Sequence, residues 1–154
     1  GMQSKPGVGA TVKHFCCNNQ EDNRFAVNEN VSEQALREIY LRGFEIAVRE
    51  SNPLALMTSY NQLNGAYTGC RHDLITDILR CEWGYTGLVM TDWGTKYSPE
   101  AALHAQVDMM MPGCHADRDA ILAALQSGTV TPVEVRRAAA RVLTLIEKSL
   151  TAKL

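Results

Sequence analysis

The sequence has few cysteines and no pattern that would organise them. There are five in 154 residues, an odd number without a Cys-x-x-Cys pair, so a disulfide framework and a zinc ribbon are both disfavoured. Unpaired cysteines are typical of a reducing compartment, which favours the cytoplasm. The histidines show no H-x-x-x-H or H-E-x-x-H spacing, so no metal site is expected.

Long apolar runs and a surplus of one charge are also missing. No run approaches the roughly 18 residues of a membrane span, and the first ten residues lack the apolar segment of a signal peptide. Fifteen basic and seventeen acidic residues offer no bulk charge for nucleic acid. Neither G-x-G-x-x-G nor a Walker sequence is present, which disfavours nucleotide binding. We therefore expect no nucleic acid, membrane or cofactor as a partner.

Short apolar runs alternate along the chain with segments of helical period. The runs predict strands near residues 8–14, 54–60, 88–91 and 107–111, and runs without polar alternation are typical of parallel sheets. Helices are predicted for 33–49 with Ser32 as cap, after Asp73, from Ser98-Pro99, from Asp117 to Gly128, and from the capping box Thr131-Pro132-Val133-Glu134. This order predicts an α/β fold with helical crossovers. Residues 15–31 form one large loop, and loops of that length are usually functional.

Three of the four predicted strands end on polar or ionisable residues. They are Lys13-His14, Ser59-Tyr60-Asn61 and Thr91-Asp92-Trp93. Because the carboxyl ends of parallel strands meet at one rim, these side chains are expected to lie together.

Asp92 and the Lys13-His14 pair each have a structural and a functional interpretation. An aspartate after a strand is most often a helix cap or a turn residue, but the next helix is predicted to begin only at Ser98. Trp93 offers a flat apolar face that suits a sugar ring. A single histidine is typically a hydrogen-bonded core residue, whereas a Lys-His pair leaving a strand favours binding of hydroxyls or an anion. The residues alone leave both interpretations open.

Five segments, taken in order, resemble the barrel domain of the family 3 glycoside hydrolases, the β-glucosidase and β-xylosidase group. The segments are KHFCCNNQEDNR, SEQALREIYLRGFEIAVRE, LMTSYNQLNGAY, LITDILRCEWGYTGLVMTDWG and VDMMMPG. The resemblance covers residues 1–150. It implies a partial TIM-type (β/α)8 barrel with about four parallel strands and crossover helices, in which residues 1–154 form a single partial domain, the second half of the barrel.

The resemblance also implies an activity and a set of site residues. The activity is retaining, exo-acting hydrolysis of β-glucosides at the nonreducing end, with a β-linked glucoside or xyloside oligosaccharide as substrate. Asp92 corresponds to the catalytic nucleophile. The substrate-binding positions are Lys13, His14, Arg24, Tyr60, Trp93 and Met57. A retaining glycosidase also needs a second carboxyl group, about 5 to 5.5 Å from the nucleophile, to protonate the leaving oxygen.

The chain departs from the family pattern in extent. It corresponds to only half of the barrel and lacks the acid/base glutamate, so the fragment alone is expected to be inactive. An open half-barrel exposes sheet edges and apolar surface, and we expect self-association or pairing with the remainder of its own chain. Cys16-Cys17-Asn18 stands where the β-N-acetylglucosaminidase branch has Pro-Gly, which favours the glucosidase or xylosidase branch. The choice between glucose and xylose stays open.

Two interpretations from other classes remain. The chain could be a noncatalytic truncated remnant or an α/β module that only binds carbohydrate. It could also be a metal-free barrel aldolase or isomerase that uses Lys13 as a Schiff base.

Overall fold

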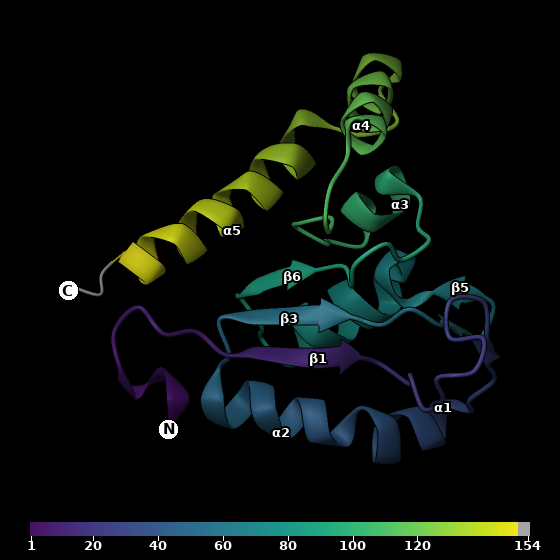
Figure 1. Ribbon diagram of the computed structural model, residues 1–154, viewed down its shortest axis with the longest axis vertical. Coiled ribbons are helices and arrows are strands. Elements are labelled where there is room, and N and C mark those ends of the chain that lie inside the picture. Colours follow the sequence, from purple (N-terminus) through teal and green to yellow (C-terminus); the bar gives the residue numbers. More distant parts are fainter. Residues whose placement is uncertain (151–154) are drawn as a thin grey trace.

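The computed structural model describes residues 1–150 and is built around a three-stranded parallel sheet (Figure 1). The strands are β1 (Thr11–Phe15), β3 (Ala55–Thr58) and β6 (Leu88–Met90), in the order β1-β3-β6. Because this order follows the chain, each crossover adds the next strand on the same side of the previous one. The α/β fold with parallel strands is confirmed.

Helices connect the strands and cover the sheet. Between β1 and β3 lie α1 (Glu33–Ala35), η2 (Leu36–Tyr40) and α2 (Arg42–Ser51), and between β3 and β6 lie the short η3 (Thr68–Cys70) and η4 (Asp73–Glu82). After β6 follow α3 (Pro99–His104), α4 (His115–Ser127) and α5 (Pro132–Leu150), while η1 (Met2–Ser4) opens the chain. Helix α2 runs beside β1 and α5 contacts β6 (Figure 1). None of the described helices is long and apolar enough to cross a membrane.

Most of the predicted helix boundaries are correct because local side chains fix them. Ser32 Oγ accepts from Ala35 N at 3.2 Å, and Ser98 Oγ does the same for the first turn of α3. At the start of α5, Glu134 Oε2 accepts from Thr131 N at 2.9 Å, which completes the predicted capping box. The predicted cap at Asp117 is wrong. Helix α4 begins at His115 and its cap is Cys114, three residues before the predicted one; Asp117 accepts from Cys114 N at 3.1 Å.

All four predicted strands are shorter than expected, and the last is reduced most. The first begins at Thr11 rather than at residue 8, and 107–111 is reduced to a single parallel bridge between Met90 and Met109. Asp108 N and Met109 N both donate to Val89 O, so a regular ladder does not develop. One residue before Pro112, Met111 N donates instead to the Thr91 hydroxyl at 2.8 Å.

A second, small sheet was not predicted. It consists of β2 (Asn28–Glu29), β4 (Gln62–Leu63) and β5 (Ala66–Tyr67), and β4 and β5 form a hairpin around Asn64-Gly65, both with positive φ (50° and 91°). The predicted loop 15–31 therefore ends in a strand. Gln62 N donates to Val27 O at 2.9 Å, which fixes the end of that loop beside the segment that follows β3.

The core lies between the sheet and the helices α2 and η4. The buried ring of Phe15 meets Phe44 edge-on at 5.0 Å and Trp83 at 6.0 Å between ring centroids. Gly87 is required where the chain enters β6, because a side chain there would collide with the Tyr85 phenol and with Leu54 O.

A buried ionic cluster centred on Asp108 joins three elements of this framework. The Asp108 carboxylate, fully buried, accepts from Arg80 of η4 at 2.7 Å, from Arg141 of α5 at 2.9 Å and from Val89 N of β6 at 2.9 Å. Burial of the guanidinium is the main reason that the pKa of Arg80 is lowered to about 10. The cluster ties α5 to the sheet.

Candidate active site

Asp92 lies just beyond the carboxyl end of β6, with its carboxylate largely buried. Its Oδ1 accepts a hydrogen bond from Trp93 N at 2.7 Å, and its backbone oxygen accepts from the Thr95 hydroxyl at 3.0 Å. Its Oδ2 lies 3.3 Å from His14 Nε2. The turn after the strand therefore fixes Oδ1, while Oδ2 is directed toward the ends of the neighbouring strands.

His14 and Lys13, neighbours on β1, occupy different environments. The His14 side chain is 31% exposed and reaches Asp92 across the end of β3. Lys13 is exposed, and no ion pair connects it with Asp92 within residues 1–150. Of this predicted basic pair, the structure brings only the histidine against the carboxylate.

Tyr60 follows β3 and completes a group of three side chains from three adjacent strand ends. The residue is 9% exposed. Burial, the negative charge of Asp92 and a hydrogen bond to its carboxylate, in that order, raise the pKa of the Tyr60 phenol above its usual value. Tyr60 thus keeps its proton at neutral pH and can donate it to Asp92.

Arg24 approaches this group from the loop after β1 by stacking on an aromatic pair. Its guanidinium carbon lies 4.8 Å from the ring centroid of Tyr60 and 5.2 Å from that of Phe25, and the two rings are 4.4 Å apart. Arg24 Nη1 donates to Glu21 Oε2 at 2.6 Å. Sequence reasoning did not predict Phe25 as part of the site. The only feature that could have indicated it is its position next to Arg24. Stacking of this kind positions the cation over the tyrosine ring.

Trp93 directly follows Asp92, and Met57 lies on β3, three residues before Tyr60. The Trp93 residue is 58% exposed, so its ring is available as an open apolar face beside the Asp92 carboxylate. Met57 is half-buried on β3, opposite Met90 in the strand register. Within residues 1–150, no three His, Cys, Asp or Glu side chains gather as a metal site would require.

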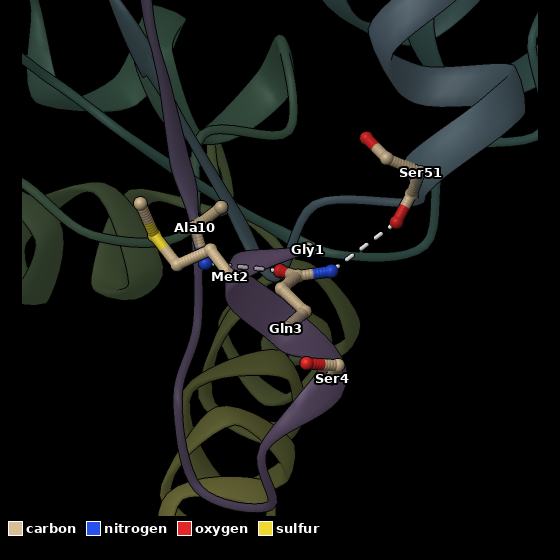
Figure 2. A pocket seen from close by; sticks show the side chains of 6 residues that line it. All are labelled: Gly1, Met2, Gln3, Ser4, Ala10 and Ser51. Atoms are coloured by element: carbon tan, nitrogen blue, oxygen red, sulfur yellow. Dashed lines mark hydrogen bonds between the residues drawn. The ribbon is translucent and has the colours of Figure 1, made fainter.

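A hollow at the opposite end of the strands has a different character. It is lined by Gly1, Met2, Gln3, Ser4, Ala10 and Ser51, and Gln3 points into it (Figure 2). The Gln3 side chain forms four hydrogen bonds to the backbone, accepting from Ala10 N and Leu54 N and donating to Ser51 O and Asn52 O. These bonds anchor the entries to β1 and β3. The hollow lacks ionisable side chains and is remote from Asp92, so it is no competing active site.

The fold and the site define an α/β protein with a buried carboxylate at the carboxyl ends of parallel strands, hydrogen-bonded by groups from neighbouring strands. Residues 1–145 match the glycosyl hydrolase family 3 N terminal domain. The chain therefore belongs to this family, and the resemblance seen in its sequence motifs is confirmed.

The alignments with two relatives cover nearly the whole of this chain. It is 49% identical over 150 residues to beta-glucosidase B of Emericella nidulans, with 96% of this chain and 18% of the relative covered. It is 43% identical over 149 residues to an exo-alpha-(1->6)-L-arabinopyranosidase of Bifidobacterium breve, with 97% and 19% covered. The chain thus spans about a fifth of the length of these relatives.

Solved structures show the same fold. A beta-glucosidase of family 3 from Bifidobacterium adolescentis superposes with a TM-score of 0.91 at 42% identity over 95% of this chain and 22% of that protein. Beta-glucosidase 3B from Thermotoga neapolitana, solved in complex with alpha-D-glucose, gives a TM-score of 0.89 at 41% identity over 96% of this chain and 22% of that protein.

Proposed function

We propose that this chain carries the nucleophile part of a glycoside hydrolase site that acts on the nonreducing-end sugar of a β-glucoside. The observation that carries the proposal is the placement of Asp92, whose Oδ2 lies 3.3 Å from His14 Nε2 and whose charge acts on the Tyr60 phenol. Of the carboxylates in the five family segments, Asp92 combines burial at a strand end with contacts from two neighbouring strands.

The reaction follows from these groups. Asp92 Oδ2 attacks the anomeric carbon, the bond from that carbon to the leaving oxygen breaks, and a covalent glycosyl-enzyme forms that water later hydrolyses with retention. The Trp93 amide holds Oδ1, His14 orients Oδ2, and the Tyr60 hydroxyl donates to the same carboxylate; His14 and Tyr60 also donate to sugar hydroxyls. Trp93 supplies an apolar wall for the sugar ring.

We further propose that the chain is a single partial domain, the second half of a (β/α)8 barrel. The support is the strand order β1-β3-β6, which follows the chain, together with the single parallel bridge between Met90 and Met109. Residues 151–154 lie outside the described part. The remainder of the barrel supplies further sugar contacts, and a separate segment supplies the acid/base group.

The names of the relatives support a glucosyl substrate. Beta-glucosidases recur among them, and two Thermotoga structures hold glucose. The arabinopyranosidase shows that the same domain occurs with a related pyranoside specificity. An oligosaccharide ending in β-linked glucose is therefore the proposed substrate, and a xyloside is the alternative.

The chain alone is expected to hydrolyse ordinary aryl glucosides negligibly, since loss of general-acid help costs about 10² to 10⁴ in rate. A mechanism-based reagent with a good leaving group avoids this requirement. In a 2,4-dinitrophenyl 2-deoxy-2-fluoro-β-glucoside the aglycone leaves as 2,4-dinitrophenolate without protonation, so nucleophilic attack alone can label the protein with the fluoro sugar.

The test is intact-mass and peptide analysis of the chain after incubation with this reagent. One glycosyl group on the peptide containing Asp92 is expected, with no label in Asp92→Asn. Asp119→Asn is the matched control, because Asp119 is exposed in a surface pair with Arg118. An unlabelled native chain, or a label retained in Asp92→Asn, would count against the proposal. Glucose binding without labelling would favour the noncatalytic carbohydrate-binding module.

A further inference from the structure

Two adjacent cysteines form a buried thiol pair immediately after β1. Cys17 Sγ donates to Cys16 Sγ at 3.6 Å, and both cysteines are free thiols, exposed by only 4% and 0%. The hydrogen bond between them raises the pKa of Cys16 and lowers that of Cys17. Cys17 is therefore the thiol that ionises first, and its thiolate is the more reactive sulfur.

The backbone disfavours direct oxidation of this pair. Adjacent α-carbons across a trans peptide are about 3.8 Å apart, whereas disulfides usually join α-carbons about 4.4 to 6.8 Å apart. The sulfurs would also have to close from 3.6 Å to about 2.05 Å. A disulfide between Cys16 and Cys17 would be strained, so the reduced pair is the stable form.

The same separation suits two bonds to one bridging atom. With thiolate bonds of about 2.3 Å, sulfurs 3.6 Å apart subtend an angle of about 103° at the bridging atom. An ion that prefers two ligands in a line does not accept that angle, and zinc needs four ligands. Among the described residues no third His, Cys, Asp or Glu joins the pair. A pyramidal trivalent arsenic atom that carries its own organic group needs only these two sulfurs.

We propose that Cys16 and Cys17 form a bidentate site for organic trivalent arsenicals. In the reaction with an arsine oxide, both thiols lose their protons, two arsenic–sulfur bonds form and the oxide oxygen leaves as water. Arsenic stays trivalent, so no oxidant or reductant takes part.

The proposal requires the loop after β1 to open locally, because both thiols are buried. Residues 16–27 contain no helix or strand. The backbone of the pair is held by Ser59 Oγ donating to Cys16 O at 2.7 Å and by Asn19 N donating to Cys17 O at 3.1 Å. Segments outside helices and strands are those in which local opening is most common. The site lies two residues beyond His14, but the proposal does not depend on the glycosidase function.

The probe is phenylarsine oxide, added to the folded chain and followed by intact mass and tryptic mapping. Trypsin cleaves after Lys13 and Arg24, so both cysteines fall in one peptide, residues 14–24. One phenylarsenic group less two hydrogens is expected on this peptide. It should survive excess glutathione, a monothiol, and be removed by 1,2-ethanedithiol.

Two variants separate chelation from simple thiol capture. Cys17→Ser should lose the glutathione-resistant adduct, whereas Cys81→Ser, which removes an exposed cysteine elsewhere, should keep it. An adduct confined to other peptides, released by glutathione or retained in Cys17→Ser would overturn the proposal. Absence of any adduct on the folded native chain would overturn it as well. If Cys17→Ser does not fold, two results on the native chain test the proposal: the peptide that carries the adduct, and its release by 1,2-ethanedithiol but not by glutathione.

Discussion

Replacing Asp108 by asparagine should destabilise the chain more than any change at its surface. The Asp108 carboxylate is fully buried and accepts from two guanidinium groups and one backbone amide. The amide side chain of Asp108→Asn would keep the shape but remove the negative charge and turn one acceptor into a donor. Arg80, whose side chain is only 5% exposed, would then be a buried cation without its counter-charge.

The expected cost follows from that uncompensated charge. Breaking a buried ion pair by removing one partner costs about 3 to 5 kcal/mol. Small domains have about 5 to 15 kcal/mol of stability in total, so the variant should lose a large part of it. With a urea dependence of about 2 kcal/mol per molar, the unfolding midpoint should fall by roughly 2 M.

The assay is urea unfolding monitored by tryptophan fluorescence, with buried Trp83 as the main reporter of core packing. Asp119→Asn is the matched control, since both partners of its pair with Arg118 are about 60% exposed and such pairs contribute about 0 to 1 kcal/mol. If Asp108→Asn loses less than about 1 kcal/mol, or no more than the control, the buried cluster does not hold α5 on the sheet as argued.

Three further predictions follow from the structure. Because α5 exposes several apolar side chains, sedimentation of the purified chain should show species larger than 17.0 kDa, and a clean monomer would contradict this. Asp92→Asn should lower the pKa of the Tyr60 phenol toward its usual value near 10, as followed by ring-carbon NMR, and an unchanged titration would show that the two groups do not interact. The hydrogen bond from the Thr131 backbone lowers the pKa of Glu134 from 4.5 to about 2, so its stabilising effect is complete above pH 4.5 and lost as pH falls to about 2. Glu134→Gln should flatten the decline in urea midpoint over that range, and an equal decline in both proteins would refute the assignment.

The features that sequence reasoning predicted well are those that depend on neighbours in the chain. The caps at Ser32, Ser98 and Thr131 and the C-terminal Gly128 each act within one turn, so their residue types determine the helix boundaries. The apolar runs likewise located β1, β3 and β6. The meeting of His14, Tyr60 and Asp92 followed from parallel strand order alone.

The features that escaped prediction depend on distant partners. The small sheet carried one local signal, the Asn64-Gly65 turn, but its strands are two residues long and their pairing with Asn28 is set across the fold. Burial and hydrogen bonding to β6 decided that residues 107–111 form only a bridge. Strand order placed Lys13 at the rim, but it could not reveal that Arg24 stacks on Tyr60 while Lys13 is exposed to solvent.

Gln3 anchors the N-terminal ends of β1 and β3 through four hydrogen bonds to the backbone, whereas Asp92 lies at the opposite end of the sheet. Trimming the leading residues, or fusing a bulky tag close to them, would leave the amides that begin two strands without their acceptor. The sheet would then open at the N-terminal ends of β1 and β3, while the carboxylate at position 92 kept its own contacts. For any study of the stability of this chain, the first ten residues should therefore be kept.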